Sequence, residues 1–282
     1  MKTIIFDYSS TLIEKISGFH IVVRFHDVAS LMQNYLSCQQ RNHVDAFMLD
    51  MPLSSLSQID FNEIWEEINS PLVLRVYNIG DLDSVFHRLE LLKKLEMRIF
   101  LSSTFKDNYY GLKILSSLGI DCGLYIQNEK PISDELLIDL ASYYYMSPVP
   151  HAKIEPFDYI ATRITGEKNL SFNHVYFKDD NCYIFVDEEL KLYSSETGKY
   201  ICPLSEYDEE KEYEQSVSQK MDTYYSHFLD LDKCSKCNAF RICSGMMHGL
   251  LANCEETMSA CLEDCLVFQK MQKQNTNELC RH

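Results

Sequence analysis

Short apolar runs alternate with amphipathic stretches over residues 1–147. The apolar runs are rich in β-branched and aromatic side chains, which is typical of buried strands. They predict strands at Thr3–Phe6, Ile21–Phe25, Ala46–Leu49, Leu72–Tyr77, Arg98–Leu101 and Gly123–Ile126. The stretches between most of them repeat with helical spacing and predict helices at Val28–Ser37, Phe61–Ile68, Leu82–Leu95, Tyr109–Leu118 and Ser133–Tyr145.

Helix boundaries are marked by capping residues. Asp27, Asp60 and Asp81 each stand directly before a predicted helix, and Gly119 follows the end of another. Strands that alternate with helices favour an α/β fold with a parallel sheet and right-handed crossovers. Five or six such units can form an open doubly wound sheet or a partial barrel, and the pattern does not choose between them.

The pattern changes after residue 147. Prolines at 148, 150 and 156 discourage regular structure, so residues 151–170 are predicted to be a linker between a βα-repeat domain (1–150) and a second domain (171–282). In the second domain, short alternating runs at Val175–Phe177, Tyr183–Val186 and Leu190–Tyr193 predict hairpin strands, and Val217–Leu229 predicts a helix. The hairpin is expected to bring Cys182 and Cys202 to one end.

Composition narrows the class of protein. The 282 residues are 46% hydrophobic, as in ordinary globular chains, and the net charge of −16 disfavours a nucleic-acid partner. The first apolar run has three residues and ends at Asp7 in the segment Ile4-Ile5-Phe6-Asp7, which is too short for a signal peptide or a membrane span. We therefore expect a soluble, cytoplasmic protein with no membrane partner.

Cysteine is concentrated near the C-terminus. The chain has 11 cysteines, and six of them fall within 32 residues: Cys234, Cys237, Cys243, Cys254, Cys261 and Cys265. The first three have the spacing Cys-x2-Cys-x5-Cys, which lets thiolates converge on one metal centre, with a fourth ligand from later in the chain. A metal or iron–sulfur site is predicted, and disulfides or buried thiols are the alternative.

These cysteines resemble the SPASM domain of radical SAM peptide-maturing enzymes, together with the upstream Cys182, Gly198 and Cys202. The resemblance implies a 4Fe-4S cluster on Cys234, Cys237, Cys243 and the late Cys265. Cys182 and Cys202 would contribute to a second cluster. The family's next cysteine position is Met247 here, so Cys254 or Cys261 would substitute for it.

The same resemblance favours a partial (β/α)6 barrel for the first domain. Radical SAM enzymes hold their catalytic cluster on Cys-x3-Cys-x2-Cys after the first strand, but residues 1–150 contain only Cys38 and Cys122. The chain thus resembles a degenerate member that lacks this motif, and no binding of S-adenosylmethionine is expected. Cys38 and Cys122 are interpreted as packed small hydrophobes.

Polar residues end several predicted strands. In a barrel this edge is the functional face, so Arg24, His26, Asp50 and Arg75 are candidate binding residues for a peptide or a small ligand. The alternative is that they are ordinary polar residues at strand ends. His26 is a conceivable general base, but no paired carboxylate is visible in the sequence, and no catalytic residue is predicted.

Three functions remain. The first is an accessory, non-catalytic protein of a ribosomal peptide maturation system, which binds a precursor peptide, a catalytic radical SAM partner, or both. The second is a peptide-modifying metalloenzyme that uses its C-terminal cluster. The third is a structural interaction protein with zinc on Cys234, Cys237, Cys243 and Cys265.

Overall fold

The computed structural model describes a chain that folds into two compact units. Described residues are 2–16, 18–81, 86–126, 132–166, 175–177, 182–194, 198–207, 232–243, 245, 247 and 250–279. Unit 1 comprises Met1–Ser102 and Tyr176–Asp222, and unit 2 comprises Ser103–Val175 and Thr223–His282. Each unit is therefore assembled from two separate stretches of chain.

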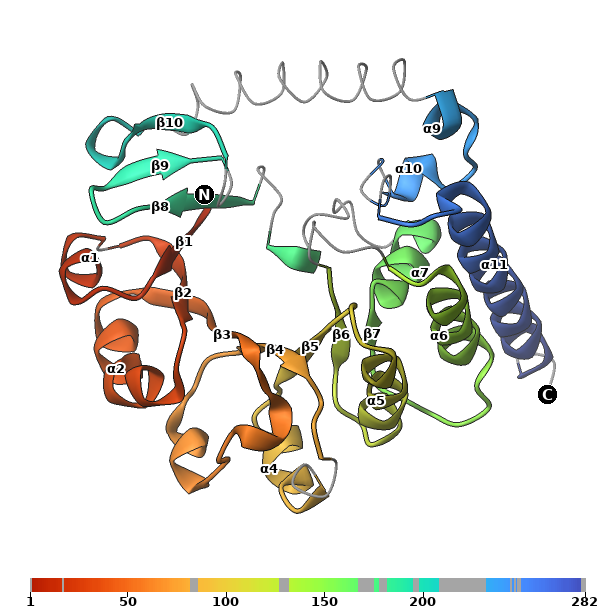
Figure 1. Cartoon of the computed structure of the whole chain (residues 1–282), viewed down its shortest axis with the longest axis horizontal. Coiled ribbons are helices and arrows are strands. Elements are labelled where there is room, and N and C mark those ends of the chain that lie inside the picture. Colours follow the sequence, from red (N-terminus) through yellow and green to blue (C-terminus); the bar gives the residue numbers. More distant parts are fainter. Residues whose placement is uncertain are drawn as a thin grey trace. The chain divides into compact units, whose positions relative to one another are not determined.

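Unit 1 is built on a mostly parallel sheet (Figure 1). Its strands are β1 (Thr3–Asp7), β2 (His20–Phe25), β3 (His43–Ser55), β4 (Leu72–Asn78), β5 (Arg98–Ser102), β8 (Tyr183–Val186), β9 (Lys191–Tyr193) and β10 (Tyr200–Pro203). They lie in the order β10-β9-β8-β1-β2-β3-β4-β5. β8 pairs in parallel with β1, while β9 is antiparallel to both β8 and β10.

Helices lie along one face of this sheet (Figure 1). They are α1 (Ser10–Lys15), α2 (Val28–Arg41) and α4 (Leu89–Lys94), with the 3-10 helices η1 (Leu56–Gln58), η2 (Glu63–Glu67) and η4 (Leu204–Glu206) elsewhere in unit 1. We call the opposite face, which carries Ile5, Arg24, Met48 and Arg75, the inner face. Apolar side chains on both faces of β1 to β5 are buried, so these strands form the core of unit 1.

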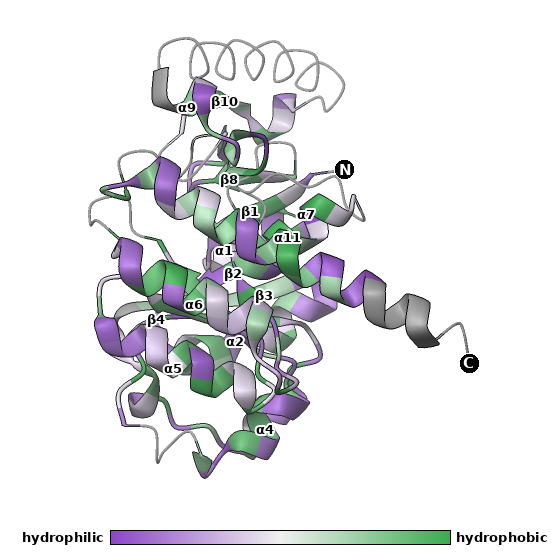
Figure 2. Cartoon of the chain, turned by 90° about the vertical axis from the view of Figure 1, so that its right-hand side faces the viewer, coloured by the Kyte–Doolittle hydropathy of each residue, from purple (hydrophilic) through white to green (hydrophobic). Residues whose placement is uncertain are grey.

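Unit 2 is mainly helical. Its elements are α5 (Lys106–Ser117), β6 (Cys122–Tyr125), α6 (Asp134–Met146), β7 (Ile154–Glu155), α7 (Phe157–Thr165), α9 (Asp232–Lys236), α10 (Phe240–Cys243) and α11 (Cys254–Leu279). α11 packs along α6, where the Ser142 hydroxyl donates to Asp264 at 2.6 Å. Both hydrophobic and hydrophilic residues occur along α6 and α11 (Figure 2).

The predicted α/β class with a mostly parallel sheet is confirmed. The six strands expected in residues 1–147 are present, and Asp27 caps α2 by accepting a hydrogen bond of 2.7 Å from the Ser30 amide. Gly119 follows α5 with a φ of +85°, as its place after the helix predicts. The strand pair Tyr183–Val186 and Leu190–Tyr193 is also confirmed as an antiparallel hairpin.

Three expectations differ from the structure. Residues 151–170, which were expected to form a linker, contain β7 and α7. Pro156 does not prevent α7, because it stands at the N-cap, where the helix needs no backbone amide as a donor. The helix expected at Phe61–Ile68 is the shorter η2, a tight turn that buries Trp65. Val175–Phe177 is a helical turn instead of a strand. The helix expected at Val217–Leu229 lies outside the described residues.

Among the helices that the structure describes, none is both long and apolar enough to cross a membrane.

Candidate functional site

Polar side chains gather at the carboxyl ends of β1 to β4, on the inner face of unit 1. Asp7 and Arg24 are register partners on β1 and β2, so their side chains point the same way. The Arg24 guanidinium donates to both carboxylate oxygens of Asp7, at 2.5 Å from Nε and 3.0 Å from Nη2. Arg24 is buried, and this two-pronged pairing offsets part of the cost of removing its charge from water.

On its solvent-exposed side, the Asp7 carboxylate also contacts a histidine. His26 Nε2 lies 2.9 Å from Asp7 Oδ1, and its Nδ1 lies 3.3 Å from the Asp50 carbonyl oxygen. Burial alone would raise the pKa of Asp7, but Arg24 and His26 outweigh it and hold this pKa below its usual value. The side chains of Asp7 and His26 are 54% and 58% exposed, so this pair can reach a ligand from solvent.

A second charged pair lies deeper on the same face. Arg75 Nη1 is 3.7 Å from Asp50 Oδ2, and Arg75 Nη2 donates to the Tyr176 carbonyl at 3.1 Å. Arg75 and Asp50 are buried, and Asp50 Oδ1 has no hydrogen-bond partner within the described part of the chain. The four binding residues predicted from sequence, Arg24, His26, Asp50 and Arg75, therefore lie in one polar cluster.

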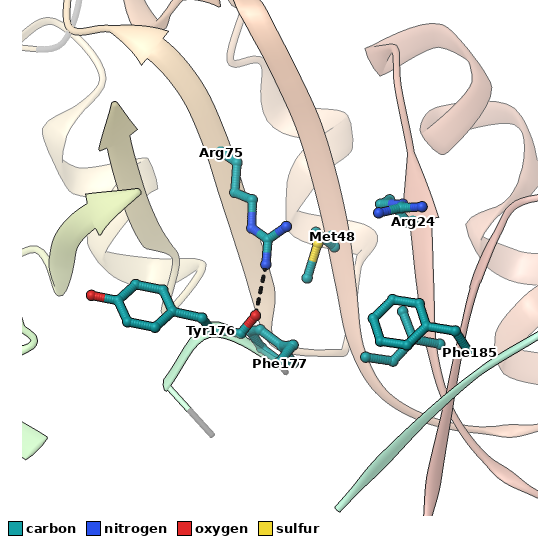
Figure 3. Close-up of a pocket in the computed structure, with 7 residues that line it drawn as sticks. Arg24, Met48, Arg75, Tyr176, Phe177 and Phe185 are labelled. Atoms are coloured by element: carbon teal, nitrogen blue, oxygen red, sulfur yellow. Dashed lines mark hydrogen bonds between the residues drawn. The ribbon is translucent and has the colours of Figure 1, made fainter. Parts of the chain in front are cut away.

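A small cavity adjoins this cluster (Figure 3). Its walls are Ile5, Arg24, Met48, Arg75, Tyr176, Phe177 and Phe185. The space among these side chains holds about one water molecule, which is too little for a small organic ligand. Tyr176 and Phe177 occupy the space on the inner face that such a ligand would need. A partner would therefore contact this site at the exposed Asp7 and His26.

The second candidate site is the cysteine group of unit 2. Cys234 lies in α9, Cys237 follows that helix, Cys243 ends α10, and Cys254 begins α11. The Cys237 amide donates to the Cys234 carbonyl at 3.2 Å, which folds the Cys-x2-Cys segment into a turn. The Met247 amide donates to Cys243 Sγ at 3.4 Å, as amides do around metal-binding thiolates.

The four thiols are close enough to influence one another's ionisation. The pKa of Cys254 is raised to about 12, mainly by burial and in smaller part by Cys243, Cys237 and Cys234, because like charges oppose each other. The pKa of Cys243 is likewise raised to about 11, mainly by burial and in smaller part by Cys237 and Cys234. Thiols are the ligands that iron–sulfur clusters and zinc prefer, and the positive charge of either would stabilise the thiolates. No three of these sulfur atoms lie within 4.8 Å of one another in the described chain, so they would have to move closer together to bind a single zinc ion.

The other late cysteines lie elsewhere. Cys265 is eleven residues after Cys254 on the same helix, which is about 16 Å along its axis. It is buried beside Tyr145 of α6, and burial raises its pKa to about 11. Cys261 is also buried, one helical turn before Cys265, and burial raises its pKa to about 12. Of these late cysteines, Cys254 is the one whose pKa is raised by Cys234, Cys237 and Cys243, while the choice of Cys265 as the late ligand stays a prediction.

Cys182 and Cys202 are not brought to one end of the hairpin. Cys182 precedes β8, whereas Cys202 lies in β10, two strands away across β9. The register places Cys202 near the level of Val186, four residues beyond Cys182, so their Cα atoms are roughly 15 Å apart. The expectation fails because β10 adds a third strand that returns the chain to the far end. None of the ten described cysteines forms a disulfide.

A comparison with protein-family models, with curated proteins and with solved structures finds no match for this chain.

The role of Tyr176, whose backbone carbonyl accepts a hydrogen bond from Arg75, was not predicted from the sequence. The only signal available was a short apolar run, and it suggested a strand.

Proposed function

We propose that this chain is an accessory, non-catalytic protein of a ribosomal peptide maturation system, acting in the cytoplasm. The observation that carries the proposal is the group of Cys234, Cys237, Cys243 and Cys254, which share one electrostatic environment in unit 2. In this proposal they hold a single 4Fe-4S cluster, whose role is to fix α9, α10 and the start of α11 as a docking surface.

The proposal includes a finer description of the fold. The sheet of unit 1 is a partial barrel like that of radical SAM enzymes, and the cysteine group is the counterpart of a SPASM domain. Residues 2–16 contain no cysteine, so the chain has no thiolates after β1 to hold a catalytic cluster. The chemistry is therefore assigned to a partner radical SAM enzyme, and this chain binds the partner, the precursor peptide, or both.

The charge of the chain supports a peptide or protein partner with a basic surface. The net charge is −16, and the exposed Asp7 adds a carboxylate at the accessible rim of the inner face. Opposite charges on two partners increase the rate of association and select against acidic partners. A precursor peptide with basic residues would meet Asp7 and His26 first.

The test has two parts. Anaerobic purification with iron, sulfide and zinc analysis should give about four irons per chain. The iron-loaded chain should then capture a precursor peptide or a radical SAM enzyme, and Asp7→Asn should weaken capture of the peptide. About one zinc and no iron would convert the proposal to a zinc-binding interaction protein, and loss of both binding partners would refute it.

A further inference from the structure

Two histidines and an aspartate meet at the amino-terminal ends of β2 and β3. His20 and His43 are the first residues of their strands and are register partners. His20 Nδ1 lies 2.8 Å from Asp45 Oδ1, and His43 Nδ1 lies 3.1 Å from the same oxygen. Among the described residues this is the one group of three histidine, cysteine or carboxylate ligand atoms that all lie within 4.8 Å of one another.

A break in strand register positions the carboxylate. Val44 pairs with Ile21 and Ala46 pairs with Val22, so Asp45 is an extra residue in β3. Such bulges redirect a side chain from its place in the pleat, and they are common beside functional sites. Thr3 of β1 then donates from Oγ1 to Asp45 Oδ2 at 2.7 Å. The carboxylate is thus fixed on one oxygen while the other faces both imidazoles.

We propose that His20, His43 and Asp45 bind one divalent transition-metal ion through His20 Nδ1, His43 Nδ1 and Asp45 Oδ1. Two imidazoles and one carboxylate are a recurrent ligand set for Zn²⁺ and Fe²⁺. Zn–N and Zn–O bonds of about 2.0–2.1 Å put tetrahedral ligand atoms about 3.4 Å apart, so the present separations need to open by only a few tenths of an ångström.

The surroundings fit an ion with an open position. The side chains of His20 and His43 are 45% and 70% exposed, so water can complete the coordination. The Thr3 hydroxyl would be the outer partner that orients the carboxylate, as second-shell groups do at metal sites. The site is built from nitrogen and oxygen atoms of unit 1 and is independent of the thiols of unit 2.

This independence makes the site measurable in the full chain. Co²⁺ bound only to nitrogen and oxygen gives weak visible bands, whereas Co²⁺ on cysteine adds an intense thiolate charge-transfer band in the near ultraviolet. We would titrate the anaerobic chain with Co²⁺, and then with Zn²⁺ to displace it. The variants are His20→Ala and His43→Ala, with His87→Ala as the control because His87 is exposed and outside the group.

The wild-type chain should bind one Co²⁺ ion that gives only the weak visible bands. Any Co²⁺ bound to cysteine would be counted separately by its charge-transfer band. His20→Ala and His43→Ala should each weaken this ion at least tenfold, and His87→Ala should not. His43 is the more exposed of the two, so its variant should keep the fold, as circular dichroism and the metal content of the cysteine group would verify. Equal binding by the wild type and His43→Ala would overturn the proposal and leave the trio as a hydrogen-bonded cluster.

Discussion

The carboxylate of Asp134, at the first position of α6, accepts a hydrogen bond of 2.6 Å from the hydroxyl of Thr257 in α11. The same carboxylate receives the amides of Ala252 and Asn253, at 3.2 and 3.4 Å. One side chain therefore holds the turn at Ala252 and Asn253, directly before Cys254, and through it the start of α11.

Replacement of Asp134 by alanine should loosen this turn. Thr257 is buried, so its hydroxyl would lose its partner, and we expect unfolding to become easier by about 1–3 kcal/mol. Metal content should fall as well, because Cys254 would no longer be held near Cys243. Denaturant unfolding and metal analysis measure the two effects. Asp139→Asn on the exposed side of the same helix is the control, and an equal loss in both variants would contradict this role of Asp134.

Cys254 and Cys265, which are about 16 Å apart along the axis of α11, should differ in their effect on metal binding. Cys254→Ser should abolish most cluster or zinc binding, because it removes a thiol from the group of Cys234. Cys265→Ser should keep the metal and cost only packing against Tyr145. Iron and sulfide analysis after anaerobic reconstitution distinguishes them. The reverse result would assign the late ligand to Cys265, as the family resemblance implies.

Loss of Asp7 should change stability in a way that depends on pH. The pKa of Asp7 is lowered in the folded chain, so the carboxylate stabilises the fold above its unfolded pKa of about 3.9, and the contribution disappears as the pH falls through the folded value. Asp7→Asn should cost about 1–2 kcal/mol at pH 7, since its side chain is half exposed, and the difference from wild type should shrink below about pH 4. Unfolding curves at several pH values test this.

The control for Asp7 is Glu14→Gln, because Glu14 forms an exposed ion pair of 3.2 Å with Arg41. Such pairs contribute about 0–1 kcal/mol. A pH-independent difference for Asp7→Asn would show that the Asp7–Arg24 pair does not carry the stability assigned to it.

Arg75 should be more sensitive than any exposed arginine. Arg75→Met would leave the buried Asp50 carboxylate without its positive partner, and such losses cost about 3–5 kcal/mol. The double variant Arg75→Met/Asp50→Leu should recover part of this loss, because no charge then remains buried. Chemical denaturation of the single and double variants gives the comparison, with Arg41→Met as an exposed control. An additive double variant would exclude coupling between the two residues.

The sequence predicts much of unit 1 because its signals are local. Asp27 before α2 and the apolar runs of β1 to β5 depend on neighbouring residues only, and these elements are present. The turn at Val175–Phe177 is not predictable in this way, since Tyr176 takes its conformation from covering Arg75, 101 residues away. Pattern reasoning assigned it to a strand because its side chains are apolar and aromatic.

The candidate sites also differ in how far local sequence signals predict them. The spacing of Cys234, Cys237 and Cys243 indicates a thiol group directly, but the choice among later cysteines depends on where the turn before α11 leads. His20 and His43 are 23 residues apart and carry no motif, and they meet only because β2 and β3 begin at the same level. The extra residue at Asp45 has no signature in the sequence.

The pairing of β1 with β8 has a consequence for synthesis on the ribosome. Thr3 of β1 pairs with Tyr183 of β8, which is translated about 180 residues later. At about 5–20 residues per second, the nascent chain waits roughly 10–40 s before this neighbour exists. During that time the edge of β1 is an open template for other strands, and chaperones that shield such edges should associate with the emerging chain until β8 leaves the exit tunnel.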